Sequence, residues 1–128
     1  FKQKKELAQQ MKGLIIKEAW IDLILDGRKT WEIRGRQTNK REKIGIIQSG
    51  TGTVIGTIDL VDCIALDNRM YYEGWDKHYY GPKALSHLLP YKKTYAWVFA
   101  NAVRFDKPEP YAHPKGAIIW VDLDKAQA

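Results

Sequence analysis

The sequence is poor in cysteine and has no long apolar run, and both absences narrow what the protein can be. Its single cysteine, Cys63, excludes a disulfide within the chain and favours a reducing compartment, so we expect a cytoplasmic location. Cys63 lies in an apolar stretch, which predicts a buried, unreactive thiol. Because no apolar run approaches the ~18 residues that cross a bilayer, no membrane association is predicted.

Histidine is also scarce, which bears on metal binding. The chain has 3 histidines, His78, His87 and His113, and their spacing matches no common set of metal ligands. One cysteine and scattered histidines are too few for a zinc site. We therefore expect no metal ion and no other cofactor.

Positive charge is concentrated at one end of the chain. The net charge is +6 over 128 residues, and the whole excess lies in residues 1–43, with twelve Lys or Arg against six Asp or Glu. Residues 44–128 carry nine of each sign. A one-sided basic surface suits a polyanion such as RNA. A solvated face that keeps the protein soluble is the alternative that charge alone leaves open.

The chain divides into a short polar tail and one domain. Residues 1–12 are polar and unlike the rest, so we interpret them as an N-terminal tail or a cloning remnant. Residues 13–128 are long enough for a single domain with its own core. A monomer is the favoured oligomeric state.

Hydrophobic periodicity predicts mostly strands. Strands are expected at 13–17, 29–34, 43–48, 53–62, 94–105 and 117–123, and helices at 18–26 and 82–89. Residues 67–80, rich in Tyr and Trp among charged side chains, fit neither pattern. About six strands with two or three short helices predict an α+β domain built on a small β-barrel.

The stretch before residue 35 holds the candidate chemistry. A helix is expected to end at Gly27 and a strand to follow at once, with Glu32 and Arg34 on one face of it. Lys29 points to the other face of a regular strand, but a bend after Gly27 would bring all three side chains together. An Arg grips a phosphate or a base edge at two points, and a Lys beside Glu and Arg can act as acid, base or oxyanion stabiliser. Ordinary cross-strand ion pairs are the alternative.

The same residues carry a family resemblance. Gly27-x-Lys29-x-x-Glu32-x-Arg34 is similar to the G-x-K-x-x-E-x-R signature of the ASCH domain family, and 94–98 and 111–123 also resemble small stand-alone bacterial members. The resemblance implies a PUA-like β-barrel and a ligand in the cleft that holds the signature. Members of the family bind RNA, act as ribonucleases, or remove the acyl group from N4-acetylcytidine.

The resemblance also implies roles for particular residues. In the small amidohydrolase members the signature Lys works with a Thr three residues later and with a Glu from a later segment. Here Lys29 holds the Lys position, but Glu32 stands where the Thr is expected. The later carboxylate is Glu73 or Asp76, of which we choose Glu73. The predicted catalytic set is Lys29, Glu32, Arg34 and Glu73.

A second set of residues is predicted to bind the substrate. Aromatic side chains can stack on a base, and basic ones can follow phosphates. The set consists of Trp20, Thr30, Arg36, Tyr72, Trp75 and His113. The favoured function is hydrolysis of N4-acetylcytidine, free or in RNA. A ribonuclease and a non-catalytic RNA-binding module are the alternatives.

Overall fold

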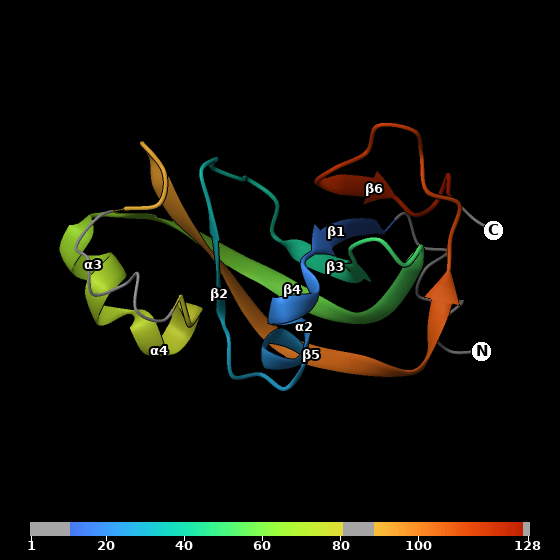
Figure 1. Ribbon diagram of the computed structural model, residues 1–128, viewed down its shortest axis with the longest axis horizontal. Coiled ribbons are helices and arrows are strands. Elements are labelled where there is room, and N and C mark those ends of the chain that lie inside the picture. Colours follow the sequence, from blue (N-terminus) through green and yellow to red (C-terminus); the bar gives the residue numbers. More distant parts are fainter. Residues whose placement is uncertain (1–10, 81–88, 127–128) are drawn as a thin grey trace.

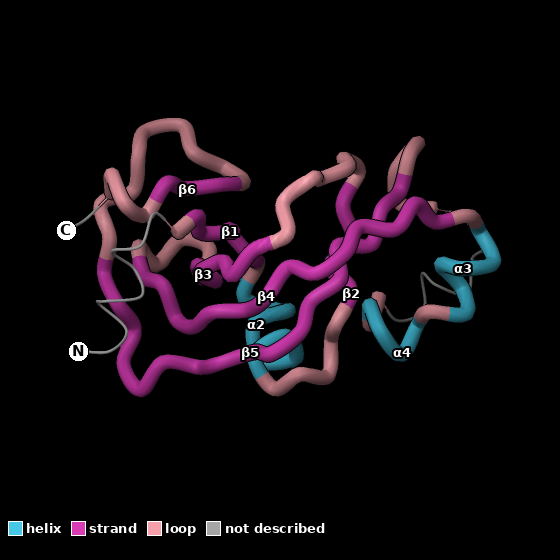
Figure 2. The backbone as a smooth tube through the Cα atoms, turned by 180° about the vertical axis from the view of Figure 1, so that it is seen from behind, coloured by secondary structure: helices cyan, strands magenta, loops and turns pink. Residues whose placement is uncertain are grey.

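The protein folds into one mixed, curled β-sheet with three short helices in the residues that the computed structural model describes, 11–80 and 89–126. In chain order the elements are β1 (Lys12–Ile16), α2 (Glu18–Leu25), β2 (Trp31–Arg34), β3 (Glu42–Gln48), β4 (Thr53–Leu66), α3 (Asn68–Glu73), α4 (Trp75–His78), β5 (Thr94–Pro110) and β6 (Trp120–Asp122). The sheet order is β2-β5-β4-β3-β1-β6, with β1 and β3 parallel. Strands β4 and β5 run along the molecule, with α3 and α4 at one end and β6 at the other (Figures 1 and 2).

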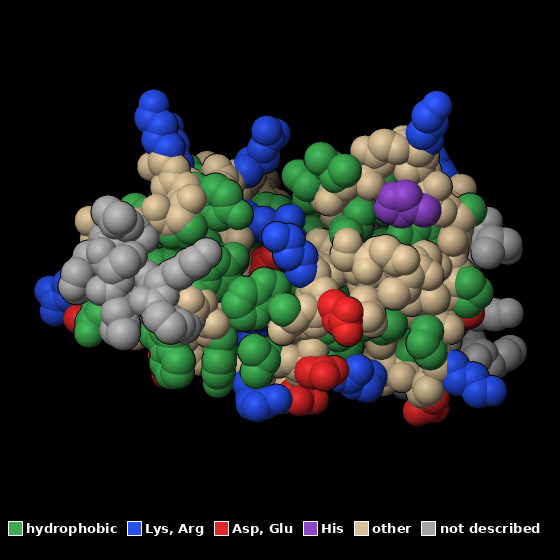
Figure 3. All heavy atoms as spheres, viewed as in Figure 1, with side chains coloured by type: hydrophobic (Ala, Val, Ile, Leu, Met, Phe, Trp, Pro, Cys, Tyr) green, Lys and Arg blue, Asp and Glu red, His purple; other side chains and the backbone are tan. Residues whose placement is uncertain are grey.

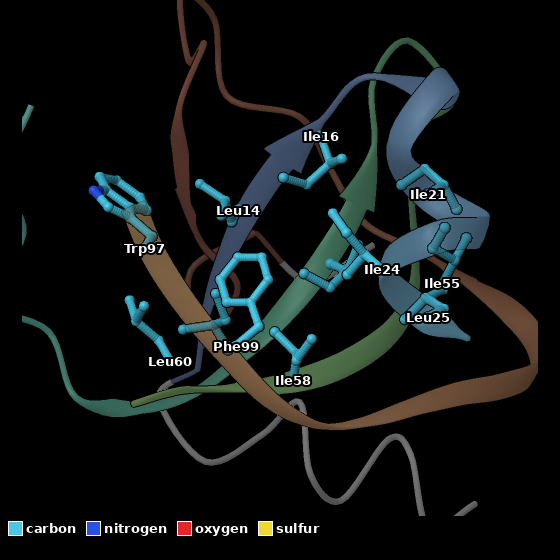
Figure 4. Packing of buried hydrophobic residues seen from close by; sticks show 12 residues of the cluster. Leu14, Ile16, Ile21, Ile24, Leu25, Ile55, Ile58, Leu60, Trp97 and Phe99 are labelled. Carbon is cyan, nitrogen blue, oxygen red and sulfur yellow. The ribbon is translucent and has the colours of Figure 1, made fainter. Parts of the chain in front are cut away.

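Helix α2 anchors the core because its apolar side chains recur on one face. Ile21, Ile24 and Leu25 are buried at the i, i+3, i+4 spacing that the sequence predicts (Figure 4). They share one hydrophobic cluster with sheet residues that include Leu14, Ile16, Ile58 and Phe99. Burying each such side chain stabilises the fold by about 1.5–3 kcal/mol. This packing fixes the end of α2, and with it the loop that leads into β2.

Irregular pairing bends the sheet. The register between β4 and β5 shifts three times between Val54 and Asp62, and each such bulge bends the strand and increases its twist. The curl turns edge strand β2 toward β1, although three strands separate the two in the sheet order. Arg34 Nη2 on β2 donates a hydrogen bond to Ile15 O on β1 across 3.2 Å. We call this gap between β2 and β1 the open side.

The α+β class, the six strands and the short helices confirm the prediction, but the sheet does not close into a barrel. Within residues 11–80 and 89–126, no ladder of backbone hydrogen bonds joins β2 to β1 or β6. Strand β2 has four residues and pairs with β5 alone. Closure would require continuous register around the whole sheet. On the open side, the hydrogen bond from the Arg34 side chain to Ile15 O stands in place of such a ladder.

Several predicted boundaries also change. Residues 67–80, which fitted no pattern, form α3 and α4, where the Asp67 side chain caps α3 by accepting from Met70 N at 2.8 Å. The helix expected at 82–89 lies outside the described residues except for Leu89. Residues 1–10 of the predicted tail also lie outside them, whereas Met11 is buried and Lys12 begins β1. Strand β2 starts at Trp31, so Lys29 precedes it.

Gly56 offers a test of the bend. A Cβ at this position would collide with the backbone oxygen of Val103 and lie 2.9 Å from Leu25 Cδ2. We therefore expect Gly56→Ala to lower the free energy of unfolding by about 1–3 kcal/mol in urea titrations. Val61→Ala, at an exposed position of the same strand, should change it by less than about 0.5 kcal/mol. Equal stability of Gly56→Ala and the wild type would contradict this account.

Candidate functional site

Lys29 is drawn into the interior by the turn that follows α2. Gly27 adopts a positive φ of 80°, and the backbone N–H groups of Arg28 and Lys29 both donate to Leu23 O. This tight turn supplies the bend after Gly27 and brings the Lys29 side chain to the face of Glu32. The Lys29 side chain has no exposed surface (0%), and its Nζ donates to Trp31 O at 2.8 Å and to His78 O at 2.7 Å. The ammonium thus joins the start of β2 to the end of α4.

Glu32 lies between two cations. Its Oε1 is 3.7 Å from Lys29 Nζ, and its Oε2 accepts a hydrogen bond from Arg34 Nε at 2.9 Å and lies 2.8 Å from Arg34 Nη2 in an ion pair. The structure therefore brings together the three signature side chains. Glu32 Oε1 is buried and has no hydrogen-bond partner among the described residues. A buried oxygen without a partner is costly unless a ligand or water satisfies it.

The surroundings change the acid–base properties of Lys29. Burial lowers the pKa of Lys29 from its ordinary 10.5 to about 8; the charge of Glu32 opposes this shift, and that of Arg34 adds to it. Two rings also face the ammonium, with centroids 4.5 Å away for Trp20 and 5.1 Å for Tyr80. Burial, with the negative charge of Glu32, raises the pKa of Tyr80. At pH 7 Lys29 is therefore mostly a cation and Tyr80 a neutral phenol.

His78 holds this arrangement from behind. Its Nδ1 accepts from Tyr80 N at 3.0 Å and its Nε2 lies 2.7 Å from Tyr71 O, so the proton must sit on Nε2. The ring stacks on Tyr71, and burial lowers the pKa of His78, so the neutral form persists. His78 thus positions Tyr80 with its ring and Lys29 with its carbonyl oxygen.

A cavity of about 230 Å³ opens beside the charged cluster. Its lining includes Ile15, Trp20, Glu32, Arg34, Tyr80 and Tyr91. Figure 3 shows a hollow in this part of the surface, where acidic and basic side chains meet between hydrophobic ones. The cavity therefore lies at the open side, with Glu32 and Arg34 in its wall. Lys29 is behind that wall and does not line it.

The predicted fourth catalytic residue does not join this cluster. Glu73 is exposed at the end of α3, and its Oε2 accepts from Arg69 Nε at 3.0 Å in a surface ion pair. Asp76, the other carboxylate that the sequence left open, is exposed beside Lys77. Both residues lie on short helices. The contact from α4 to Lys29 is made by the backbone oxygen of His78 and not by an acidic side chain. The carboxylate of the site is Glu32 alone among the described residues that line the cavity.

Of the predicted binding residues, the structure places some at the cavity and others away from it. Trp20 lines the cavity, whereas Tyr72 and Trp75 are exposed at 41% and 45% on α3 and α4. Thr30 is partly buried and binds Lys77 and Phe99 through its backbone. His113 uses both ring nitrogens internally, with Tyr111 Oη at 2.7 Å and Ala117 O at 2.9 Å.

The basic loop after β2 is largely paired. Arg41 and Lys43 lie 3.7 and 3.5 Å from the carboxylates of Asp62 and Asp59. Arg36 is exposed and lines a second hollow beside the first. Arg36, rather than the whole loop, therefore lies at a hollow of the surface.

Three residues of the site were not in the predicted set. Tyr80 belongs to the aromatic segment, but nothing in the sequence separates it from its exposed neighbours. His78 acts through hydrogen bonds to backbone atoms, and such bonds leave no pattern in the sequence. Tyr91, 44% exposed, lies between the two hollows and follows no recognisable motif. In the part of the chain described, no cluster of three or more His, Cys, Asp or Glu could hold a metal ion.

Comparison with known proteins places the chain in a family. The model of the ASCH domain matches residues 14–109. The chain belongs to the ASCH domain family. An ASCH protein from Zymomonas mobilis has a solved structure that aligns with a TM-score of 0.63 at 16% identity, over 77% of this chain and 72% of that one. A tyrosine-to-phenylalanine variant of it aligns with a TM-score of 0.64 at 17% identity, over 80% and 76%.

These structural similarities establish the fold. At such low identity they carry no assignment of activity. No curated protein sequence matches the chain. None of the helices among the described residues is long and apolar enough to cross a membrane.

The shifted pKa of Lys29 predicts how stability depends on pH. Between about pH 8 and 10.5 the unfolded chain keeps a proton that folded Lys29 has released, so this group makes the free energy of unfolding rise with pH. The wild type should gain stability relative to Lys29→Met across this window, measured by urea unfolding at several pH values. Lys92→Met, which removes an exposed lysine, controls for the loss of a lysine as such. Parallel curves for the wild type and Lys29→Met would refute the burial account.

Proposed function

We propose that this ASCH domain hydrolyses N4-acylated cytidine, with the acylated base bound in the cavity beside Glu32. The observation that carries the proposal is the Glu32 Oε1 atom, which is buried in the cavity wall and has no hydrogen-bond partner among the described residues. Its other oxygen is fixed by Arg34. A carboxylate held in this way is suited to accept a proton from a bound water.

The aromatic wall suits a planar base. The rings of Trp20 and Tyr80 are parallel within 5°, with centroids 5.0 Å apart, and both line the cavity. Base stacking on an aromatic side chain contributes about 1–3 kcal/mol per base. The stack is itself fixed, since Lys29 faces both rings and His78 binds the Tyr80 backbone. A base can therefore bind without first ordering its platform.

The proposed reaction is a direct attack by water. Glu32 takes one proton from the water, whose oxygen forms a bond to the acyl carbon. Arg34 Nη1 has no hydrogen-bond partner among the described residues. It donates to the acyl oxygen and stabilises the negative charge that develops there. The bond between the acyl carbon and N4 then breaks, and N4 receives the proton from Glu32. The products are cytidine and a carboxylic acid, and no threonine nucleophile is needed.

Lys29 takes an indirect part in this proposal. It does not line the cavity, and two carbonyl oxygens occupy two of its three N–H groups. The third lies toward Glu32 Oε1 at 3.7 Å. The cation thereby stabilises the negative charge of Glu32 and holds it in place. Lys29 is a positioning residue in this account, whereas Glu32 and Arg34 touch the reacting atoms.

Replacement of Glu32 tests the proposal. Glu32→Gln keeps the size and much of the hydrogen bonding to Arg34 but cannot accept the proton, so kcat should fall by about 10²–10⁴-fold. The measurement is chromatography of cytidine released from N4-acetylcytidine. Glu42→Gln, at an exposed position of β3, is the matched control and should keep full activity. Release of no cytidine by the wild type, or undiminished release by Glu32→Gln, would overturn the proposal.

Binding of RNA without turnover is the second candidate, and one observation favours it. The cavity adjoins a second hollow whose lining contains two arginines, Arg34 and Arg36. Affinity for a polyanion falls steeply with salt, because phosphate contacts release counterions. Hydrolysis of the neutral nucleoside should have a KM that is nearly constant between 50 and 200 mM salt, within about twofold. Salt-dependent binding of single-stranded RNA without cytidine release would favour the binding module, and cleavage of that RNA would favour a ribonuclease.

A further inference from the structure

A second hollow adjoins the proposed nucleoside cavity. Its volume is about 410 Å³, and its lining includes Arg34, Arg36, Tyr91, Trp97, Ile119 and Trp120. No carboxylate lines it among the described residues, in contrast to the first cavity, which contains Glu32. Arg34 is paired with Glu32, but Arg36 has no ion-pair partner among the described residues and favours an anionic ligand, and the two indoles favour a planar one.

The indoles belong to an ordered stack of rings and cations. The rings of Trp97 and Trp120 lie 5.8 Å apart at 17°, Arg34 lies 5.4 Å from the centroid of Trp97, and Lys40 Nζ lies 5.3 Å from that of Trp120. Trp97 is buried, and its Nε1 donates to Arg36 O at 2.9 Å. Trp120, with Lys40 Nζ over its ring, is partly exposed. It is therefore the ring that a ligand can reach.

The two hollows share lining residues. Arg34 and Tyr91 line both of them, so the two hollows are neighbours on the surface and a ligand longer than one nucleoside can contact both. The Tyr91 ring packs closely on Gly35, where an added Cβ would lie 2.8 Å from Tyr91 Cδ1. Arg36 has no ion-pair partner among the described residues, unlike Arg41 in the same loop. Arg36 lines the second hollow, next in sequence but one to Arg34, which lines both.

We propose that the second hollow binds the nucleotide that adjoins the acylated cytidine, so that a single strand of two or more nucleotides binds more tightly than the free nucleoside. The inference rests on the proposed function, because it takes the first cavity as the nucleoside site. Arg36 binds the linking phosphate, and the neighbouring base stacks on Trp120. A free phosphate would use Arg36 but not the exposed part of the Trp120 ring, which is why the ligand is a nucleotide and not an anion alone.

Binding of unacylated ligands tests the inference independently of catalysis. We would measure by calorimetry the Kd of cytidine, of its 3′- and 5′-monophosphates, and of 2′-O-methylated dinucleotides with cytidine at either end. One order of the dinucleotide should bind about tenfold more tightly than the better monophosphate, since stacking contributes on that scale. The monophosphate should in turn bind more tightly than cytidine, and Arg36→Gln should abolish that difference.

Variants of Trp120 test whether the tighter binding of the dinucleotide comes from the Trp120 ring. Trp120→Leu should remove the advantage of the dinucleotide and leave the Kd of cytidine unchanged, and Trp120→Phe should keep most of it. Arg28→Gln, at an exposed arginine outside both hollows, controls for charge, and thermal unfolding checks that each variant is folded. A dinucleotide that binds no better than the monophosphate, or equal losses for cytidine and dinucleotide in Trp120→Leu, would overturn the inference.

The outcomes separate this inference from the proposed function. Trp120-dependent dinucleotide binding without hydrolysis of N4-acetylcytidine would refute the proposed function and support the second subsite. Hydrolysis without a dinucleotide advantage would refute the second subsite alone. Absence of binding for every ligand would refute both.

Discussion

Burial of the Lys29 ammonium is the constraint on which the site depends. A charge with no exposed surface costs several kcal/mol unless acceptors surround it. Two of those acceptors are carbonyl oxygens of Trp31 and His78, from β2 and α4, and the third group is the carboxylate of Glu32. Satisfying Lys29 therefore requires the α3–α4 segment to pack against β2. The same packing places Tyr80 beside Trp20 and forms the aromatic wall of the cavity.

The position of Glu32 departs from the pattern that the resemblance implies for amidohydrolase members, which have a threonine there. Glu32 lies between two cations and the site offers no hydroxyl at this position, so the proposal gives the attack to water. The later carboxylate of that pattern has no counterpart in the cavity among the described residues, since Glu73 is paired with Arg69 at the surface. In the proposed reaction one residue, Glu32, therefore has the functions that the pattern divides between two.

Local patterns in the sequence predicted the strands and helix α2 well, but they did not predict that the sheet stays open. The spacing of Ile21, Ile24 and Leu25 predicts α2, as the structure confirms. The alternation in β2 predicts Glu32 and Arg34 on one face of the strand, where their side chains meet. Whether six strands close into a barrel depends on bulges, which arise from pairing across the sheet. The site was predictable where it follows the signature motif. His78 was not, because its partners are backbone atoms.

The open side has a consequence for how the site can vary. It is crossed by a hydrogen bond from Arg34 on β2 to Ile15 O and by no backbone ladder among the described residues. Substitutions along this gap change the size and polarity of the opening while leaving the strand pairing intact. Ligand preference can therefore change here at little risk to folding, because a site is carried by the fold and is not fixed by it.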